Sequence, residues 1–354
     1  MQTIKLLNTI STWGLLSCLL IAANSHATEN GNIERRKSVI KIYDVSSKDN
    51  LLIDNQFGQV KINLWDKNEI RVDISIKANS SNDDQAQQFL DAVEIEDKKE
   101  GNQISLLTII HKNGGANWSW NKSNGKGNYV QIDYNVSMPK NTPLTVKNRF
   151  GNTDVPIFSA PLNIISKYGT FSANDLGIKN DIDVSYGKAE IQKMSNGSLD
   201  IAYSTLELDK ANNLVLVNKF GKMKIGEVET LDGQFSYSGG RIGIIKGSSK
   251  IKLSFSGGFR IDQLNPSADN MDIQASYSSL TMPVENNDCN FDVTVSYGGF
   301  KYPNDRQVSF TQNDDDKKDD THGHKTTKQY VGKMGKGNGS KIKIVSKYGE
   351  VSLR

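Results

Sequence analysis

The sequence predicts an all-β protein organised as a β-solenoid with coils of 17–18 residues. Three observations predict this class. Apolar residues alternate with polar ones along most of the 354 residues, and a short unit ending in an aromatic residue followed by Gly or Ser recurs. The chain is also rich in Gly, with 30 residues, and poor in Pro, with 7. Period-two alternation is typical of strands, and self-similarity at a fixed period is typical of solenoids.

The recurring unit forms a series that begins at residue 150. Its aromatic residues are Phe150, Tyr168, Tyr186, Tyr203, Phe220, Tyr237, Phe255, Tyr277, Tyr297 and Tyr348. Successive aromatics are 18, 18, 17, 17, 17, 18, 22, 20 and 51 residues apart. An earlier copy, Asn55-Gln56-Phe57-Gly58, stands apart from the series. Six consecutive spacings of 17 or 18 indicate one structural unit that is repeated.

The apolar alternation changes phase directly after each aromatic residue. Apolar side chains precede it at even offsets, as at Ile182 and Val184, and follow it at odd offsets, as at Ala189 and Ile191. Because a one-residue shift turns side chains to the other face of a strand, the Gly or Ser is expected to form a bulge or sharp bend. Two short strands cannot bury an apolar face alone, so coils must stack.

Ten such coils, separated by steps of ~4.8 Å, would form a rod of roughly 43 Å from the first coil to the last. An up-and-down antiparallel sheet or barrel, which also uses short strands at regular spacing, is the alternative architecture. The fixed aromatic column and the change of phase favour the solenoid.

The aromatic residues are in phase with the apolar positions two and four residues earlier. This predicts a column inside the molecule or at a corner, stacked coil on coil, and we interpret it as structural because aromatic residues dominate core packing. An exposed ladder that binds sugars is the alternative. Two residues before the aromatic, a buried polar ladder is expected from Asn148, Ser166 and Asn218. One residue before it, outward-pointing side chains are expected at Arg149, Lys167, Lys219 and Lys347.

Residues 1–27 have the pattern of a secretory signal peptide. Lys5 precedes an apolar stretch that ends before Asn24, and Ser25-His26-Ala27 fits a cleavage site that leaves Thr28 as the first mature residue. The apolar run is about half of the ~20 residues that span a bilayer, and no later run is long enough, so we expect no membrane span after cleavage. Lipidation at Cys18 is the alternative.

Composition argues against several classes of function. The net charge of +3 is too balanced for a dedicated nucleic-acid binder. After residue 27 the only cysteine is Cys289, so no intramolecular disulfide is expected, and three histidines remain. The sequence has no nucleophile elbow, phosphate-binding loop or zinc-protease motif. It therefore predicts a non-enzymatic protein with no cofactor and no metal; a β-helical polysaccharide lyase is the enzyme alternative.

Residues 28–146 lack a clean period and are expected to begin the solenoid and cover its open end. Strands are predicted at Val39–Val45, Val60–Trp65, Ile70–Ile76, Ile104–Ile110 and Tyr129–Val136. One short helix is predicted over residues 82–93. It begins at a capping sequence, Ser81-Asn82-Asp83-Asp84, and places Ala86, Phe89, Leu90 and Val93 on one face.

Two inserts interrupt the pattern, and regular coils are expected over residues 147–303. The first insert, from His111 to Asn128, is rich in Gly and Asn and carries Trp118 and Trp120. These tryptophans pack back onto the protein or bind a ligand, and with Tyr129 they are the candidate binding residues. The second insert, residues 304–339, is rich in Asp, Lys and Gly and is expected to be a solvated loop before a terminal coil at 340–354. Its Asp spacing matches no calcium motif.

The opening Asn55-Gln56-Phe57-Gly58, the following Val60, Ile62 and Leu64-Trp65-Asp66, and the later aromatic–Gly repeats resemble a known family. It is the bacterial putative-adhesin domain of unknown function, related to head-domain proteins of the autotransporter-adhesin type. The resemblance covers roughly residues 36–354 and implies a secreted, right-handed parallel β-solenoid. No functional residue carries over from it, because the resemblance lies in the repeat pattern.

These features predict a secreted, non-enzymatic, adhesin-like protein of the bacterial periplasm or outer cell surface. A rigid rod would present loops to a glycan or to an envelope or surface protein, without nucleic acid. A structural or assembly role in the envelope is the alternative.

Overall fold

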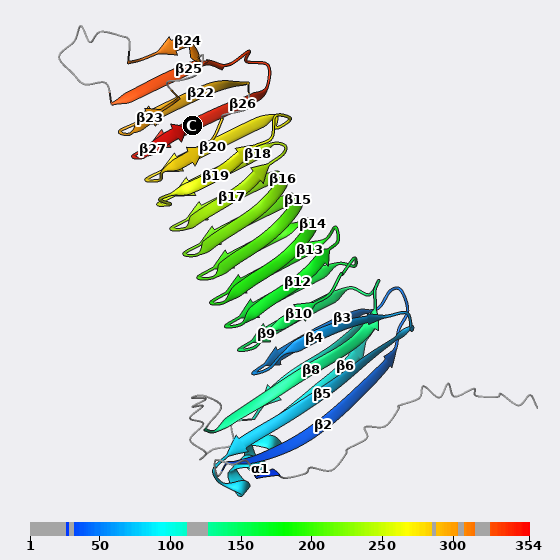
Figure 1. Cartoon of the computed structure of the whole chain (residues 1–354). Coiled ribbons are helices and arrows are strands. Elements are labelled where there is room, and N and C mark those ends of the chain that lie inside the picture. The colour runs from blue at the N-terminus through cyan, green and yellow to red at the C-terminus, as the bar shows by residue number, and fades with distance from the viewer. Residues whose placement is uncertain (1–25, 28–31, 112–126, 285–287, 304–307, 316–325) are drawn as a thin grey trace, which may run out of the picture.

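The computed structural model describes residues 26–27, 32–111, 127–284, 288–303, 308–315 and 326–354. Within these residues the protein is all-β, with a 27-stranded sheet and one helix. Figure 1 shows a tall stack of strands with the N-terminal strands at one end and the C-terminal strands at the other. The all-β class and the single short helix are confirmed. The sheet is mixed, however, so the expectation of a wholly parallel sheet is wrong.

The middle of the stack consists of strands that pair in parallel with the strands one repeat away. Ile191 lies beside Leu208, and Leu208 lies beside Ile225. We call the two strands on either side of one aromatic residue a layer. The strands are β9 (Leu144–Arg149), β10 (Thr153–Val155), β11 (Leu162–Lys167), β12 (Thr170–Leu176), β13 (Asn180–Ser185), β14 (Lys188–Ala202), β15 (Thr205–Lys219), β16 (Lys222–Ser236), β17 (Gly239–Ile245), β18 (Ser249–Ser254), β19 (Phe259–Leu264), β20 (Asn270–Ser276) and β21 (Leu280–Met282).

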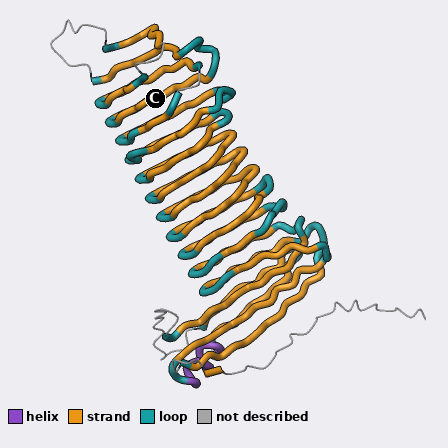
Figure 2. The backbone as a smooth tube through the Cα atoms, viewed as in Figure 1, coloured by secondary structure: helices purple, strands orange, loops and turns teal. Residues whose placement is uncertain are grey.

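The core lies between the two strands of each layer. Ile182 and Val184 face inward before the aromatic residue, Ala189 and Ile191 face inward after it, and all four are buried. Each fully buried Val or Ile side chain contributes about 1.5–3 kcal/mol. Since the same positions are apolar in layer after layer, the core is continuous along the stack. Figure 2 shows the connecting turns gathered along the two edges, which leaves the faces to the strands.

The N-terminal strands combine antiparallel and parallel pairing. β2 pairs with β5, β5 with β8, and β6 with β7, all antiparallel, while β7 and β8 run parallel to β3 and β4. The strands are β1 (His26–Ala27), β2 (Ile33–Asp44), β3 (Asn50–Gln56), β4 (Val60–Trp65), β5 (Glu69–Ser80), β6 (Val93–Glu100), β7 (Gln103–Ile110) and β8 (Tyr129–Pro139). The five expected strands are present, four of them longer than predicted, and β3 and β6 were not expected.

The single helix, α1, spans Asp83–Asp91, and its local sequence explains where it begins. The side chain of Asn82 accepts a hydrogen bond from the backbone N–H of Gln85 at 3.1 Å, which caps the first turn. Its residues Ala86, Phe89 and Leu90 are buried. The expected range of 82–93 extends too far, because Val93 already begins β6.

The C-terminal segment does not follow chain order in the stack. Its strands are β22 (Cys289–Ser296), β23 (Gly299–Lys301), β24 (Val308–Asn313), β25 (Thr327–Met334), β26 (Ser340–Lys347) and β27 (Glu350–Leu353). β26 pairs in parallel with β20 on one side and with β22 on the other, so the last layer in sequence is enclosed between two earlier ones. β25 and β24 continue the sheet beyond β22 as antiparallel strands.

The expectation of a solvated loop over residues 304–339 is therefore wrong for β24 and β25. Short alternating stretches within a charged, Gly-rich segment form a hairpin there because they can pair with the open edge of β22. His322 and His324 lie outside the described residues.

A buried polar network joins the N-terminal strands to the first layers. Asn55 donates to the carbonyl of Ile132 at 3.0 Å, and Thr108 donates to the side-chain oxygen of Asn55 at 3.0 Å. Asn148, the register neighbour of Asn55, donates to the carbonyl of Gly58 at 3.0 Å. The expected polar positions are thus buried in the stack, and here they tie together segments that are far apart in sequence.

Asn218 occupies the same column but lacks such partners. Its side chain is fully buried, and neither amide atom has a hydrogen-bond partner among the described residues. The positions beside it in neighbouring layers are Ile201 and Phe235. An unpaired buried amide costs about 1–3 kcal/mol, so this column mixes stabilising and destabilising polar groups.

Asn218→Leu should therefore stabilise the protein by about 1 kcal/mol or more, because it replaces an unpaired buried amide with an apolar side chain of similar volume. Asn148→Leu is the matched control and should destabilise by about 1–3 kcal/mol, since it removes the hydrogen bonds from Asn148 to the carbonyls of Gly58 and Asn152. Urea and thermal unfolding midpoints of both variants test this. Equal losses of stability in the two variants would contradict the assignment.

Candidate binding surface along the aromatic ladder

One column of aromatic residues runs along the whole stack, and we call it the aromatic ladder. In stacking order its members are Phe57, Phe150, Tyr168, Tyr186, Tyr203, Phe220, Tyr237, Phe255, Tyr277, Tyr348 and Tyr297. Neighbouring rings are 4.6–5.1 Å apart between centroids and lie within 3–11° of parallel. The expected coil-on-coil stack is confirmed. Phe57, which stands apart in sequence, packs directly on Phe150.

The backbone at each ladder residue adopts a left-handed conformation. The φ angles lie between 50° and 63°, and in the described part of the chain no other residue except glycine has a positive φ. For a bulky side chain this conformation costs roughly 1–2 kcal/mol. It reverses the chain between the two strands of a layer, so it supplies the sharp bend that the change of phase indicated.

The residue after the aromatic completes the turn. A Cβ on Gly151 would lie 1.8 Å from the carbonyl oxygen of Gly58, and one on Gly169 would lie 2.0 Å from that of Gly151. Gly is therefore required where two such turns pack closely. Where Ser occurs instead, as at Ser204, its hydroxyl accepts a hydrogen bond from the backbone N–H of Gly187 at 2.9 Å. The aromatic–Gly/Ser pattern is thus a turn signal.

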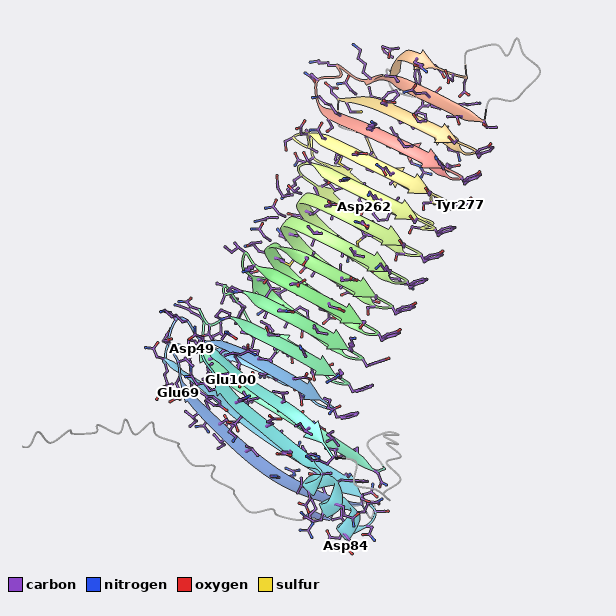
Figure 3. The ribbon with its side chains drawn as sticks, turned by 180° about the vertical axis from the view of Figure 1, so that it is seen from behind. Asp49, Glu69, Asp84, Glu100, Asp262 and Tyr277 are labelled. Atoms are coloured by element: carbon purple, nitrogen blue, oxygen red, sulfur yellow. The ribbon has the colours of Figure 1, made fainter. Side chains whose placement is uncertain are left out.

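The ladder lies at the surface along one edge of the stack, so of the two expected placements, inside or at a corner, only the second holds. Ten of its members are 46–59% exposed, and Phe57 is half-buried. The phase argument assumed an extended backbone up to the aromatic residue, but the left-handed turn rotates the ring out of the core. Figure 3 shows the labelled Tyr277 at one edge of the stack, pointing away from the strands. Alternation could not decide between the two expected placements, because it says nothing about a residue inside a turn.

Stacking determines which part of each ring is exposed. From Phe150 to Tyr348 in stacking order, every ring has a parallel neighbour on both faces. The solvent therefore contacts ring edges and the phenol hydroxyls of the tyrosines. Sugars that bind by lying flat on an aromatic face would find these nine faces covered. The alternative of an exposed ladder that binds sugars on its ring faces is therefore wrong for these nine rings.

Two columns of side chains flank the ladder, one residue before and two residues after each aromatic. Arg149, Lys167, Lys219 and Lys347 are exposed as predicted. Lys188 and Lys222, which the sequence interpretation did not single out, stand on the other side. Glu350 is the one carboxylate in these two columns among the described residues, and it pairs with Lys301 at 2.7 Å. The flanks of the ladder are therefore basic.

Four of these cations have no opposing charge within ion-pair distance in the described structure: Lys167, Lys219, Lys222 and Lys347. Arg149, by contrast, pairs with Asp54 at 2.9 Å. Lys188 contacts Glu190 at 2.5 Å and Glu207 at 3.2 Å. The unpaired lysines are the charges that are available to a ligand.

A hollow of about 440 Å³ lies at the N-terminal end of the ladder. Phe57, Phe150 and Tyr129 line it together with Gln59, Gln131, Asp133 and Asn152. The backbone N–H of Gln59 donates to Asp133 at 3.0 Å, and the side chain of Gln131 donates to the same carboxylate at 2.7 Å. An aromatic wall beside polar groups with fixed orientations is the usual composition of a small ligand site.

The predicted binding residues meet this hollow in part. Tyr129 begins β8 and lines the hollow, and its hydroxyl donates to Glu34 at 3.4 Å. Trp118 and Trp120 lie outside the described residues, so their predicted role stays a prediction. The nearness of Tyr129 to Phe57 could not be found from sequence, because more than 70 residues separate them.

A second hollow, of about 630 Å³, lies on the outward face near the C-terminal end. β20, β26, β22, β25 and β24 form it, and Lys333, Lys341, Lys343, Asp272 and Asp292 line it. Charges of both signs alternate there, so the hollow has no clear preference for an anion or a cation.

In the described ranges no three His, Cys, Asp or Glu side chains gather as metal ligands would. Cys289 is buried in β22. Burial and the neighbouring carboxylate of Asp200 raise the pKa of Asp183, which stands on the outer face of β13. Over the same ranges, no helix has the length and apolar character that crossing a membrane requires.

Comparisons with known proteins give low-identity likenesses in solved structures. No family model and no curated protein matches the chain. A putative cell adhesion protein from Clostridium sporogenes is 12% identical, with a TM-score of 0.22, over 90% of this chain and 98% of its own. A putative adhesin from Bacteroides fragilis is 12% identical, with a TM-score of 0.30, over 90% and 97%. A putative lipid binding protein from Parabacteroides distasonis is 13% identical, with a TM-score of 0.34, over 69% and 96%.

These similar structures come from bacteria, and two of them are described as adhesion proteins. Their TM-scores are too low to support any argument about this chain. The resemblance to autotransporter-adhesin head domains stays a prediction, and function is argued from the ladder and its flanks.

Removing one ring should measure the contribution of stacking to stability. Tyr203→Ala keeps the left-handed backbone but loses the contacts with Tyr186 and Phe220, so a loss of about 1–3 kcal/mol is expected from two stacked pairs. Tyr203→Asn should lose less, because Asn tolerates this backbone conformation. Tyr203→Phe should be neutral. Chemical unfolding of the three variants tests this, and an unchanged midpoint for Tyr203→Ala would show that the ladder does not stabilise the fold.

Proposed function

We propose that this protein is a secreted, non-enzymatic, adhesin-like β-solenoid that binds a glycan or protein ligand at the bacterial cell envelope. The observation that supports it most is the ladder of half-exposed aromatic rings together with the lysines that flank it along the stack. A large exposed apolar surface that is continuous over a soluble domain commonly marks an interaction site. Here the surface stands on a backbone that is hydrogen-bonded layer to layer.

The solenoid interpretation rests on the register of the middle strands. Thirteen residue pairs join β14 to β15 in parallel, and thirteen join β15 to β16, each with an offset of 17 residues. In our proposal residues 147–303 form right-handed parallel coils, residues 28–146 begin and cover one end, and residues 340–354 form a further coil. The antiparallel pairings of β2 with β5 and of β24 with β25 support covered ends.

Residues 1–27 would direct export as a signal peptide and be removed, which would place the protein in the periplasm or on the outer cell surface. Lipidation at Cys18 would instead attach it to a membrane. The apolar run and the Ser25-His26-Ala27 cleavage pattern support the first reading.

The proposed recognition residues are Trp118, Trp120 and Tyr129. The position of Tyr129 supports this, because it stands in the hollow at the end of the ladder beside Phe57 and Phe150. Tryptophan and tyrosine are the side chains most often found at the centres of binding interfaces.

An assembly role is the second candidate, and one feature of the fold favours it. β24 has a hydrogen-bonded neighbour on one side only among the described strands. An unpaired edge of this kind can accept a strand from another protein. Oligomers that form with rising concentration, without any ligand, would support this role.

Screening residues 28–354 on glycan and matrix-protein arrays tests the proposed function. We expect binding to a subset of ligands and a loss of about tenfold or more in Trp118→Ala/Trp120→Ala, equal to about 1.4 kcal/mol. The matched control is Trp65→Ala, because Trp65 lies in β4 and bonds to Glu69 within the fold. Circular dichroism verifies folding.

Three results would contradict this proposal. Equal binding by wild type and both variants would remove the tryptophans from the site. Absence of binding by any form, together with concentration-dependent oligomers in sedimentation, would favour assembly. Release of unsaturated oligosaccharide from a polyanionic glycan would show a lyase.

A further inference from the structure

The exposed edges of the aromatic ladder carry positive electrostatic potential. An aromatic ring is negative on its faces and positive at its edge, and in this ladder the nine inner rings have both faces covered by neighbours. Seven members are tyrosines, whose hydroxyl groups can donate hydrogen bonds outward. The ladder therefore presents a line of electropositive hydrogens, which attract oxygen acceptors and anions.

The flanking charges have the same sign as these edges. Lys167, Lys219, Lys222 and Lys347 stand beside the ladder without an opposing charge within ion-pair distance in the described structure, although Asp183 attracts Lys167 from a longer distance. The first three lie within four consecutive layers, from Tyr168 to Phe220. Edge potential and lysine charge thus add along one line instead of cancelling.

The spacing of the ladder restricts the shape of a matching ligand. The rings repeat every 4.6–5.1 Å along a nearly straight column. An extended polysaccharide also repeats along its axis at about the length of one sugar ring, so successive sugars can meet successive layers in similar ways. A compact ligand would contact few layers and would gain little from such a column.

We infer that the aromatic ladder binds a linear polyanionic glycan, whose carboxylates pair with the flanking lysines and whose ring oxygens accept hydrogen bonds from the tyrosines. This inference rests on the proposed binding function and names the class of ligand. A uronate polymer has the required repeat and charge.

Other occupants fit the ladder less well. Neutral polysaccharides that bind proteins by stacking need exposed ring faces, and the inner rings have none. Single-stranded nucleic acid also gains its affinity from bases stacked on aromatic faces. A second copy of this chain would bring the same unpaired lysines against each other, so its approach along the ladder would be repulsive.

Polygalacturonate binding by residues 28–354, measured by calorimetry at low and moderate salt, tests the inference. The test variant is Lys167→Gln/Lys219→Gln/Lys222→Gln/Lys347→Gln. Its affinity should be lower by about tenfold or more, and this affinity should depend less steeply on salt concentration. The matched control, Lys179→Gln/Lys224→Gln/Lys250→Gln/Lys252→Gln, removes four exposed lysines away from the flanking columns and should retain affinity. Dextran and single-stranded DNA should bind weakly.

A second variant separates the hydroxyl groups from the charges. Tyr186→Phe/Tyr203→Phe/Tyr237→Phe/Tyr277→Phe keeps every ring and should lower affinity severalfold without a change in the unfolding midpoint.

Several outcomes would overturn the inference while leaving a binding function intact. These are equal losses in the test and control variants, DNA binding as tight as polygalacturonate binding, or array ligands that bind the wild type and the lysine variant alike. Absence of every ligand on the arrays would instead remove the proposed function itself.

Discussion

The left-handed turn at each ladder residue is the constraint on which the rest of the structure depends. It reverses the chain within a few residues, and it sets the phase of the apolar alternation on both sides of the aromatic. A bulky residue in this conformation is strained by roughly 1–2 kcal/mol. Each stacked pair returns about 0.5–1.5 kcal/mol, so strain and stacking are of similar size. The turn is stable in a stack of layers and would be unfavourable in an isolated one.

The same constraint explains what could be predicted from sequence. The identity of the inward-facing residues follows from the aromatic spacing and the change of phase, and α1 follows from its Asn82 cap and apolar face. The number of layers follows only in part, because the regular series has ten aromatic residues and the ladder also contains Phe57. The exposure of the ladder could not follow, because alternation describes extended backbone and the aromatic lies in a turn. β6 was missed because its sequence, VEIEDKKE, is that of an exposed edge strand with few apolar residues.

The order of the aromatic residues in the sequence also differs from their order in the stack. The gap of 51 residues between Tyr297 and Tyr348 predicted an insert before a final coil, yet Tyr348 lies between Tyr277 and Tyr297. The chain leaves one layer open, forms β24 and β25 beyond it, and then returns to fill the gap with β26. Phe57 and Phe150 show the same effect at the other end, where β5, α1 and β6 lie between them in sequence. In both places the ladder is continuous where the sequence is interrupted.

The exposure of the rings does not by itself indicate binding, because the turn would place them at the edge whatever the protein does. The flanking column is more informative, since the fold imposes little there. Ser185, Ala202, Ser236 and Ser254 occupy the position before the aromatic as readily as Lys167 or Lys219 do. Lysine at such a permissive position, without a carboxylate within ion-pair distance, adds repulsion and no packing. Its presence next to electropositive ring edges is therefore better explained by an anionic ligand than by folding.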